Sequence, residues 1–134
     1  MSIYVRLRVA AEAYAMPVGH VREIADIGTV TPVPGLRPEM LGVRNLRGQI
    51  LPVIDLAMLL RVARTDTPAR LLVAEAGGLA AGLAIDEVSG VGEMPEPTDE
   101  SDSDLLSGAV LDGSDLIGVI DVPGVFAELE RAQR

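Results

Sequence analysis

Short apolar stretches separated by glycine and proline run along most of the chain and predict a structure made mainly of β-strands. In residues 3–9 every second residue is aliphatic, and the residues between them are Tyr4, Arg6 and Arg8. This period of two is typical of a strand with one solvated face. Prolines and a glycine between 32 and 38 exclude regular structure there. Strands this short, with almost no long helical pattern, indicate an all-β barrel or sandwich rather than a doubly wound α/β fold.

Glycine-containing turns and two short amphipathic stretches complete the predicted elements. The two predicted hairpins are 70–75 with 79–85 around Gly77-Gly78, and 105–111 with 116–121 around Asp112-Gly113. One short helix is predicted over 56–61, with Asp55 at its N-cap, and another over 125–131. Pro52 lies in the apolar stretch 49–55 and cannot donate to a ladder, so we expect it at an edge strand or a bulge.

The second half of the chain repeats the first. Residues 50–56 (ILPVIDL) match residues 116–122 (LIGVIDV) at a shift of 66, and each stretch follows a glycine, Gly42 or Gly108, at the same spacing. The upstream residues Met16, Val18, Val21 and Ile24 align at a shift of 67 with Leu83, Ile85, Val88 and Val91. A repeat that keeps both pattern and spacing predicts two related β units.

Composition restricts the environment of the protein. A chain of 134 residues suits one compact domain, and with only three aromatic residues its core must be aliphatic. No apolar run is long enough to span a bilayer, and charges interrupt the N-terminal stretch where a signal peptide would be continuously apolar. The absence of cysteine agrees with a reducing compartment. We therefore expect a cytoplasmic protein that does not insert into the membrane.

Charge is unevenly distributed. The net charge is −9, but residues 1–70 hold nine arginines against six acidic residues, whereas residues 71–134 hold two arginines against fourteen. Such polarity could orient partners in an assembly, or it could serve solubility alone. Both interpretations stay open from the sequence.

The side chains that catalysis requires are scarce. The chain has one histidine, His20, and no cysteine, and it lacks a glycine-rich phosphate loop, a nucleophile elbow and a His/Cys metal motif. His20 stands beside Gly19 in a turn-like setting and is expected to be a surface residue. We expect a protein that is not an enzyme and that carries no cofactor.

Two charged segments were considered as ligand sites. Residues 93–104 hold six carboxylates, yet they lack the glycine and the closing glutamate of a calcium loop, so we expect a solvated, mobile loop and no metal. Six arginines between Arg37 and Arg70 could form a nucleic-acid surface on a small barrel. No aromatic residue for base stacking lies between Tyr14 and Phe126, so nucleic-acid binding remains a distant alternative.

The most informative segment is Gly42–Leu56, with the sequence GVRNLRGQILPVIDL. Asn45 and Gly48 suit positive φ, which predicts a tight connection between strands that projects or pins Arg47. The segment resembles the Gly-Val-x-Asn-Leu-Arg-Gly…Pro-Val-x-Asp-Leu signature of CheW-like domains. Further matching pieces occur in the family's order: Val21-Arg-Glu-Ile24, Val33-Pro34, Ile85-Asp-Glu-Val88, Leu106-Ser-Gly108 and Val119-Ile-Asp121.

The resemblance runs from about Tyr14 to Phe126 and implies a fold and a function. The fold would be mainly β, with two intertwined five-stranded SH3-like barrels around a common core and short helices, in agreement with the repeat. We expect a single domain over 1–134, with a first barrel at 14–66, a second at 68–122, and the strand 3–9 and the helix 125–131 packed on them. The function would be that of a non-enzymatic scaffold, which couples the cytoplasmic hairpin tip of methyl-accepting chemoreceptors to the regulatory domain of a CheA-type histidine kinase.

The resemblance also assigns partner-binding residues. Val21, Glu23, Gly42 and Arg47 fall on positions near the family's receptor groove, and Asn45, Leu46 and Gly48 form the backbone of the motif. We hypothesise that Glu23 and Arg47 form an ion pair, since a bidentate guanidinium–carboxylate contact would hold the groove wall in shape. The kinase is expected to dock on exposed β surface at the barrel ends, through apolar residues with a polar rim.

Two alternatives remain. The chain could be the CheW-like regulatory domain of a kinase or of a coupling–receiver fusion, or an unrelated small-barrel binding module. A chain that begins at Met1 and ends just past its last helix leaves no room for a kinase or receiver domain, so we expect a free-standing coupling protein.

Overall fold

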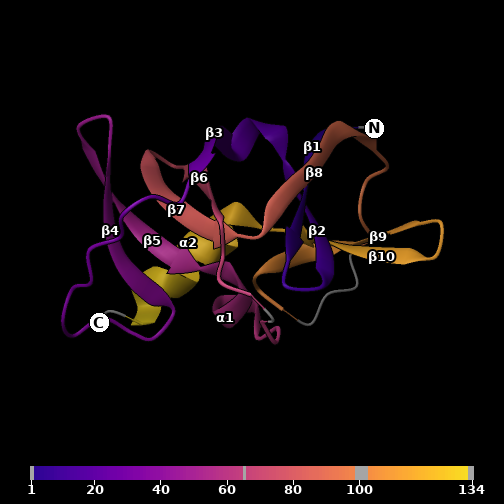
Figure 1. The fold of residues 1–134 in the computed structure, drawn as a ribbon. Helices are drawn as coiled ribbons and strands as arrows, with labels where there is room; N and C mark the ends of the chain where they lie inside the picture. The colour runs from indigo at the N-terminus through magenta and orange to yellow at the C-terminus, as the bar shows by residue number, and fades with distance from the viewer. Residues whose placement is uncertain (1, 65, 99–102, 133–134) are drawn as a thin grey trace.

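The structure is a computed structural model that describes residues 2–64, 66–98 and 103–132 (Figure 1). Its strands are β1 (Ser2–Val9), β2 (Glu12–Pro17), β3 (Val21–Asp26), β4 (Met40–Leu46), β5 (Gln49–Asp55), β6 (Arg70–Ala76), β7 (Leu79–Ile85), β8 (Glu87–Met94), β9 (Leu106–Asp112) and β10 (Asp115–Ile120). Its helices are the 3₁₀ turn η1 (Val18–His20), α1 (Leu56–Leu60) and α2 (Val122–Ala132). The mainly β class expected from the sequence is confirmed.

The strands form two five-stranded sheets that exchange strands between the halves of the chain. Sheet I has the order β3-β6-β7-β5-β4 and comes from residues 21–85, whereas sheet II has the order β8-β1-β2-β10-β9 and comes from residues 2–17 and 87–120. The ranges 14–66 and 68–122 expected for the barrels differ from these sheets, because β3 pairs with β6 and β1 pairs with β8. Among the described residues neither sheet closes into a hydrogen-bonded ring, so each barrel is an open, curled sheet.

The sequence repeat is reproduced in the pairing register. Gly42 lies opposite Val53 in sheet I, and Gly108 lies opposite Val119 in sheet II, each beside a register shift. The two glycines have φ of 143° and 145°, and a Cβ at either position would collide with a threonine carbonyl oxygen, that of Thr31 or Thr98. The same backbone approach therefore requires glycine twice.

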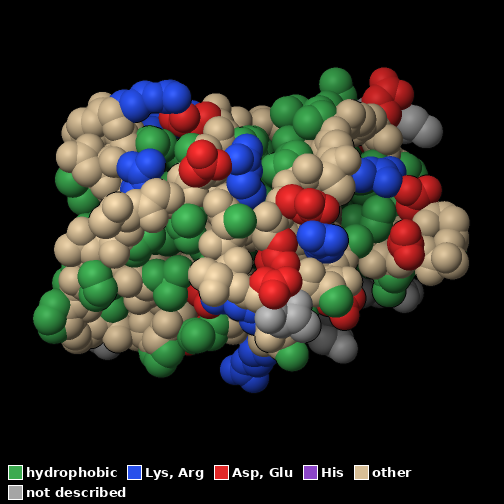
Figure 2. Space-filling view, viewed as in Figure 1, with side chains coloured by type: hydrophobic (Ala, Val, Ile, Leu, Met, Phe, Trp, Pro, Cys, Tyr) green, Lys and Arg blue, Asp and Glu red, His purple; other side chains and the backbone are tan. Residues whose placement is uncertain are grey.

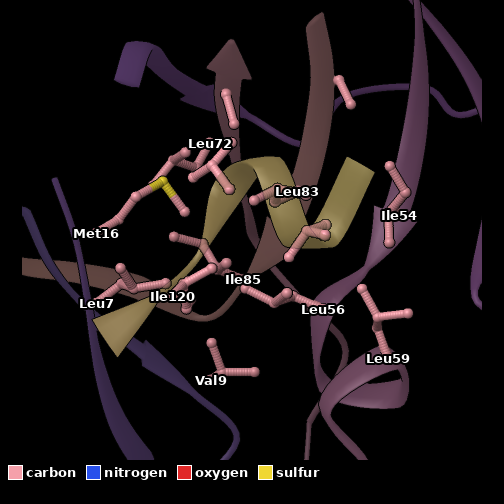
Figure 3. Close-up of a cluster of buried hydrophobic side chains, with 14 of the residues drawn as sticks. Leu7, Val9, Met16, Ile54, Leu56, Leu59, Leu72, Leu83, Ile85 and Ile120 are labelled. Carbon is pink, nitrogen blue, oxygen red and sulfur yellow. The ribbon is translucent and has the colours of Figure 1, made fainter. Parts of the chain in front are cut away.

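A single large hydrophobic core joins the two sheets. Leu7, Met16 and Ile120 of sheet II pack with Leu72 and Leu83 of sheet I (Figure 3). Helix α2 adds its own apolar face to this cluster. A smaller cluster lies in each sheet and includes Val119 in sheet II and Val53 in sheet I. Residues that are far apart in sequence thus share one interior.

Strand β1 departs from the simple alternation that its sequence predicts. Tyr4, expected on the solvated face, is 3% exposed and packs in the small cluster of sheet II, whereas Ile3 is 48% exposed. Val5, Leu7 and Val9 face the shared core as expected. The strand is covered on both faces near Tyr4 because its sheet curls around that side chain.

Both α-helices begin at an aspartate. Asp55 is the N-cap of α1, and its Oδ1 accepts a hydrogen bond from the Met58 amide at 3.2 Å. Asp121, its counterpart in the repeat, accepts from the Gly124 amide at 3.1 Å, so α2 starts at Val122 rather than at 125. Pro52 lies in an interior strand rather than at an edge, one residue before the parallel pairing of β5 with β7 begins.

Candidate partner-binding site

The β4–β5 hairpin ends in a two-residue turn formed by Arg47 and Gly48. Leu46 pairs with Gln49 across it, and φ is 52° at Arg47 and 83° at Gly48, as in a type I′ turn. Asn45 was expected to adopt positive φ and does not: it lies in β4, and its Oδ1 accepts a hydrogen bond from the Gly48 amide at 3.0 Å. We call residues 45–50 the hairpin tip.

Arg47 projects from the hairpin tip and pairs with Glu23 of β3. The Arg47 Nη1 lies 2.9 Å from the Glu23 Oε2, so the pairing predicted from the sequence is confirmed. The Arg47 side chain is 77% exposed and that of Glu23 is 22% exposed. An ion pair this exposed contributes about 0–1 kcal/mol to stability. The contact therefore mainly orients a guanidinium that is largely exposed to solvent.

Three other residues assigned to the site, Val21, Gly42 and Leu46, lie behind its exposed residues. Leu46 packs against the small apolar cluster of sheet I, and Val21 packs against the shared core. Gly42 lies at the register shift of β4, where its neighbour Val43 forms a bridge with Thr31. The structure thus brings Glu23, Asn45, Arg47 and Gly48 together at the surface, whereas Val21, Gly42 and Leu46 shape the sheet behind them.

An exposed apolar surface, not found from the sequence, lies on β1, β8 and the η1 turn before β3. Ile3, Val18 and Val91 are 48%, 42% and 65% exposed. Val91 and Ile3 are diagonal neighbours across β8 and β1, and Val18 follows Pro17, which pairs with Tyr4. Figure 2 shows apolar side chains gathered on this face, over β1, β8 and the segment leading into β3. We call Ile3, Val18 and Val91 the apolar patch.

A second exposed apolar pair lies on the β9–β10 hairpin. Leu111 and Leu116 are directly opposite each other and are 70% and 66% exposed. Asp112 and Asp115 border the turn beside them, and the Arg6 Nη1 binds the Asp112 Oδ2 at 2.6 Å. Apolar side chains with a charged rim are the usual anatomy of a protein interface. In Figure 1 this hairpin and the β4–β5 hairpin lie at opposite ends of the molecule.

Because each sheet takes strands from both halves of the chain, the uneven distribution of charge follows the sheets rather than the halves. The segment that forms sheet I, residues 21–85, holds seven arginines against six acidic residues. The segments that form sheet II, 2–17 and 87–120, hold two arginines against ten. The two sheets, rather than the two halves of the chain, are therefore the electrically different units, and each presents one exposed hairpin.

Reactive groups do not gather within residues 2–64, 66–98 and 103–132. That part of the chain contains no cluster of three or more histidine, cysteine, aspartate or glutamate residues able to hold a metal ion. His20 is half-buried, and its Nδ1 lies 3.0 Å from the Glu75 carbonyl oxygen. No described helix is long and apolar enough to cross a bilayer.

The acidic segment 93–104 is only partly described, because residues 99–102 lie outside the described ranges. Its first residues are attached to sheet II: Met94 is buried, and Glu96 accepts a hydrogen bond from the Ser2 hydroxyl at 2.8 Å. Thr98 forms a bridge with Ala109 of β9. The mobile loop expected over the whole segment is therefore fastened to the sheet at least as far as Thr98.

Two curled sheets with exposed apolar and ion-paired hairpins define a protein-binding module. Residues 4–130 match the CheW-like domain family. A probable chemotaxis protein CheW from Rhizobium etli is 33% identical over 94% of this chain and 88% of that protein. The protein PilI from Pseudomonas aeruginosa is 33% identical over 68% of this chain and 52% of that protein. In structure, the scaffolding protein TtCheW from Thermoanaerobacter tengcongensis superposes with a TM-score of 0.81 and 26% identity, over 90% of this chain and 88% of that one.

The chain belongs to the CheW-like family. Its function is that of a chemotaxis-type coupling adaptor, in agreement with the resemblance of the Gly42–Leu56 segment.

Proposed function

We propose that this protein couples the cytoplasmic hairpin tip of a chemoreceptor to the regulatory domain of a CheA-type histidine kinase, through two separate surfaces and without chemistry of its own. The observation that carries the proposal is the exposed Arg47–Glu23 pair on the β4–β5 hairpin, at the opposite end of the molecule from the β9–β10 hairpin with its exposed Leu111 and Leu116. Such a scaffold acts in the cytoplasm, where receptor tips and kinase meet.

The receptor surface consists of the Arg47-Gly48 turn of the hairpin tip and the apolar patch. The apolar side chains Ile3, Val18 and Val91 supply area that is removed from water on binding. Arg47 is already oriented by Glu23, so that less side-chain freedom is lost on binding. This combination fits an amphipathic helical hairpin whose rim carries hydrogen-bond acceptors.

The kinase surface is the β9–β10 hairpin. Leu111 and Leu116 form a cross-strand apolar pair on β9 and β10, and β9 is an edge strand of sheet II. The acidic rim of Asp112 and Asp115 favours a partner with an apolar patch and basic neighbours. Because this hairpin and the hairpin tip are at opposite ends of the molecule, both partners can be bound at once.

Calorimetry with purified partners tests the two surfaces separately. Arg47→Glu and Glu23→Arg should each weaken binding of a receptor-tip fragment, and the double swap should restore much of it, with kinase binding unchanged throughout. Leu111→Ser with Leu116→Ser should weaken kinase binding by about tenfold or more, as for apolar residues central to an interface, and leave receptor binding intact.

Leu79→Ser is the matched control, because Leu79 is also an exposed strand leucine, 48% exposed, but belongs to neither surface. It should leave both affinities unchanged. A double swap that fails to restore receptor binding would contradict a role of the Glu23–Arg47 ion pair in that binding. Normal kinase binding by the serine variants would remove the β9–β10 hairpin as the kinase surface.

A further inference from the structure

Strand β3 contains one extra residue where it pairs with β6. Val21 lies opposite Ala74 and Glu23 lies opposite Val73, so Arg22 is the inserted residue of a β-bulge. Neighbouring residues of a regular strand point to opposite faces, and a bulge interrupts that alternation. Here the side chains of Arg22 and Glu23 both reach the hairpin tip, at Gln49 and at Arg47.

The Arg22 guanidinium bridges two other strands. Its Nε and Nη2 donate to the Glu75 Oε2 of β6, the former at 2.8 Å, and its Nη1 donates to the Gln49 Oε1 at 2.6 Å. A planar guanidinium can make these contacts along two of its edges in one fixed orientation. Glu75 therefore anchors the group that holds Gln49.

The side chains of Arg22 and Glu23 connect β3 to the hairpin tip, although β3 forms no described ladder with β4 or β5. Strand β3 is one edge of sheet I and β4 is the other, and β3 pairs with β6 alone in the described ladders. Gln49 is the first residue of β5 and directly follows the Arg47-Gly48 turn. The turn is consequently fixed on one side by Glu23 and on the other by Arg22.

We propose that Arg22 is a positioning residue for partner binding, which acts through Gln49 to hold the turn that presents Arg47. This inference rests on the proposed function, in which the hairpin tip contacts the receptor. The Arg22 and Glu75 side chains are 37% and 46% exposed, so their contact adds little to stability. Its effect appears in binding, because a loosened turn must be ordered again when the partner arrives.

The central variant is Arg22→Gln, studied in the intact protein. It should weaken binding of a receptor-tip fragment by about tenfold, within the range of coupling between contacting residues, while the urea midpoint of unfolding hardly moves. Amide exchange of Gly48, whose N–H is bound to Asn45 Oδ1, should become faster. Kinase binding should not change.

The matched control is Arg70→Gln. Arg70 also joins β3 and β6, through an exposed contact of its Nη1 with the Asp26 Oδ1 at 2.6 Å, but it touches nothing at the hairpin tip. This variant removes the same charge from the same strand pair. It should leave receptor binding and the exchange of Gly48 as they are in the wild type.

A double-mutant cycle separates positioning from direct contact. If Arg22 acts through Gln49, then Gln49→Ala should add almost no loss of receptor binding to Arg22→Gln. Additive losses, an unaffected Arg22→Gln variant, or an equal loss in Arg70→Gln would each overturn the proposal. A wild-type protein that binds no receptor fragment would instead overturn the proposed function. The positioning of the turn would then be tested by amide exchange alone, and unchanged exchange of Gly48 in Arg22→Gln would contradict it.

Discussion

Arg47 occupies a backbone conformation that glycine or asparagine usually adopts. Its φ is 52°, and Arg61, at the C-terminal end of α1, has φ of 60°. A side chain in the left-handed region costs about 1–2 kcal/mol. At Arg47 the strained residue carries an exposed guanidinium held by Glu23, in agreement with the binding role proposed for it.

This strain predicts opposite effects on stability and binding. Arg47→Gly should leave the free energy of unfolding unchanged or raise it by up to about 1 kcal/mol, because relief of strain offsets the greater freedom of glycine in the unfolded chain. Receptor binding should nevertheless be lost. Arg61→Gly should change the free energy of unfolding in the same way as Arg47→Gly, but it should leave receptor binding unaltered. Urea unfolding and calorimetry measure both quantities, and a clearly destabilised Arg47→Gly protein would contradict the interpretation.

Single residues of the site were partly predictable. The Glu23–Arg47 pair followed from opposite charges placed on motif positions, and the structure contains it. The prediction of positive φ at Asn45 was wrong, because a residue that favours turns can also stabilise a turn by a side-chain hydrogen bond from the adjoining strand. The exposure of Val91 could not be foreseen, since an apolar residue in a strand carries no sign of whether its face is covered.

At the scale of elements, the N-cap residues of α1 and α2 occupy equivalent positions in the sequence repeat but differ in burial. Asp55 is 2% exposed, caps α1 and forms an ion pair with Arg64. Asp121 caps α2 and is half-exposed. The repeat therefore provides a buried and a more exposed version of the same cap.

The difference predicts unequal costs of removing the caps. Asp55→Ala should lower the free energy of unfolding by about 2–4 kcal/mol, because it removes a cap and leaves the partly buried Arg64 unpaired. Asp121→Ala should lower it by about 1 kcal/mol, the usual cost of a lost cap. Urea unfolding of the two variants checks this, and equal losses would show that the burial of Asp55 has no energetic role.

Strand and hairpin positions were largely predictable because glycine turns and period-two alternation act locally. The hairpin β6–β7 turns at Gly77-Gly78 as expected, whereas β9–β10 turns at Gly113-Ser114, one residue later than expected. The pairing of β1 with β8 and of β3 with β6 was not foreseen. Such pairs join distant parts of the chain, and each strand would look the same with any other neighbour.

For the whole molecule, the exchange of strands makes the two sheets one folding unit. Leu7 of sheet II and Leu72 of sheet I lie in the same core cluster, together with residues of α2. Each sheet has a small cluster of its own, but the largest cluster is formed by both sheets together. The repeat in the sequence predicted two related units, but only the topology shows that they share their interior.

We therefore expect one cooperative unfolding transition. Leu7→Ala and Leu72→Ala should each cost about 2–5 kcal/mol and shift the same transition. Native-state hydrogen exchange should give equal opening free energies for the slowest amides of β2 and β7. Separate transitions, with sheet II opening while sheet I stays protected, would contradict the shared core.

Coupling requires that one molecule hold both partners simultaneously, and this is tested most directly by mixing the protein with a cognate receptor-tip fragment and the kinase regulatory domain. Size-exclusion chromatography with light scattering then measures the mass of the complex. The account predicts a single species containing all three chains, from which Arg47→Glu removes the receptor and Leu111→Ser with Leu116→Ser removes the kinase. Mutual displacement of the two partners, or failure of either to bind the wild-type protein, would contradict it.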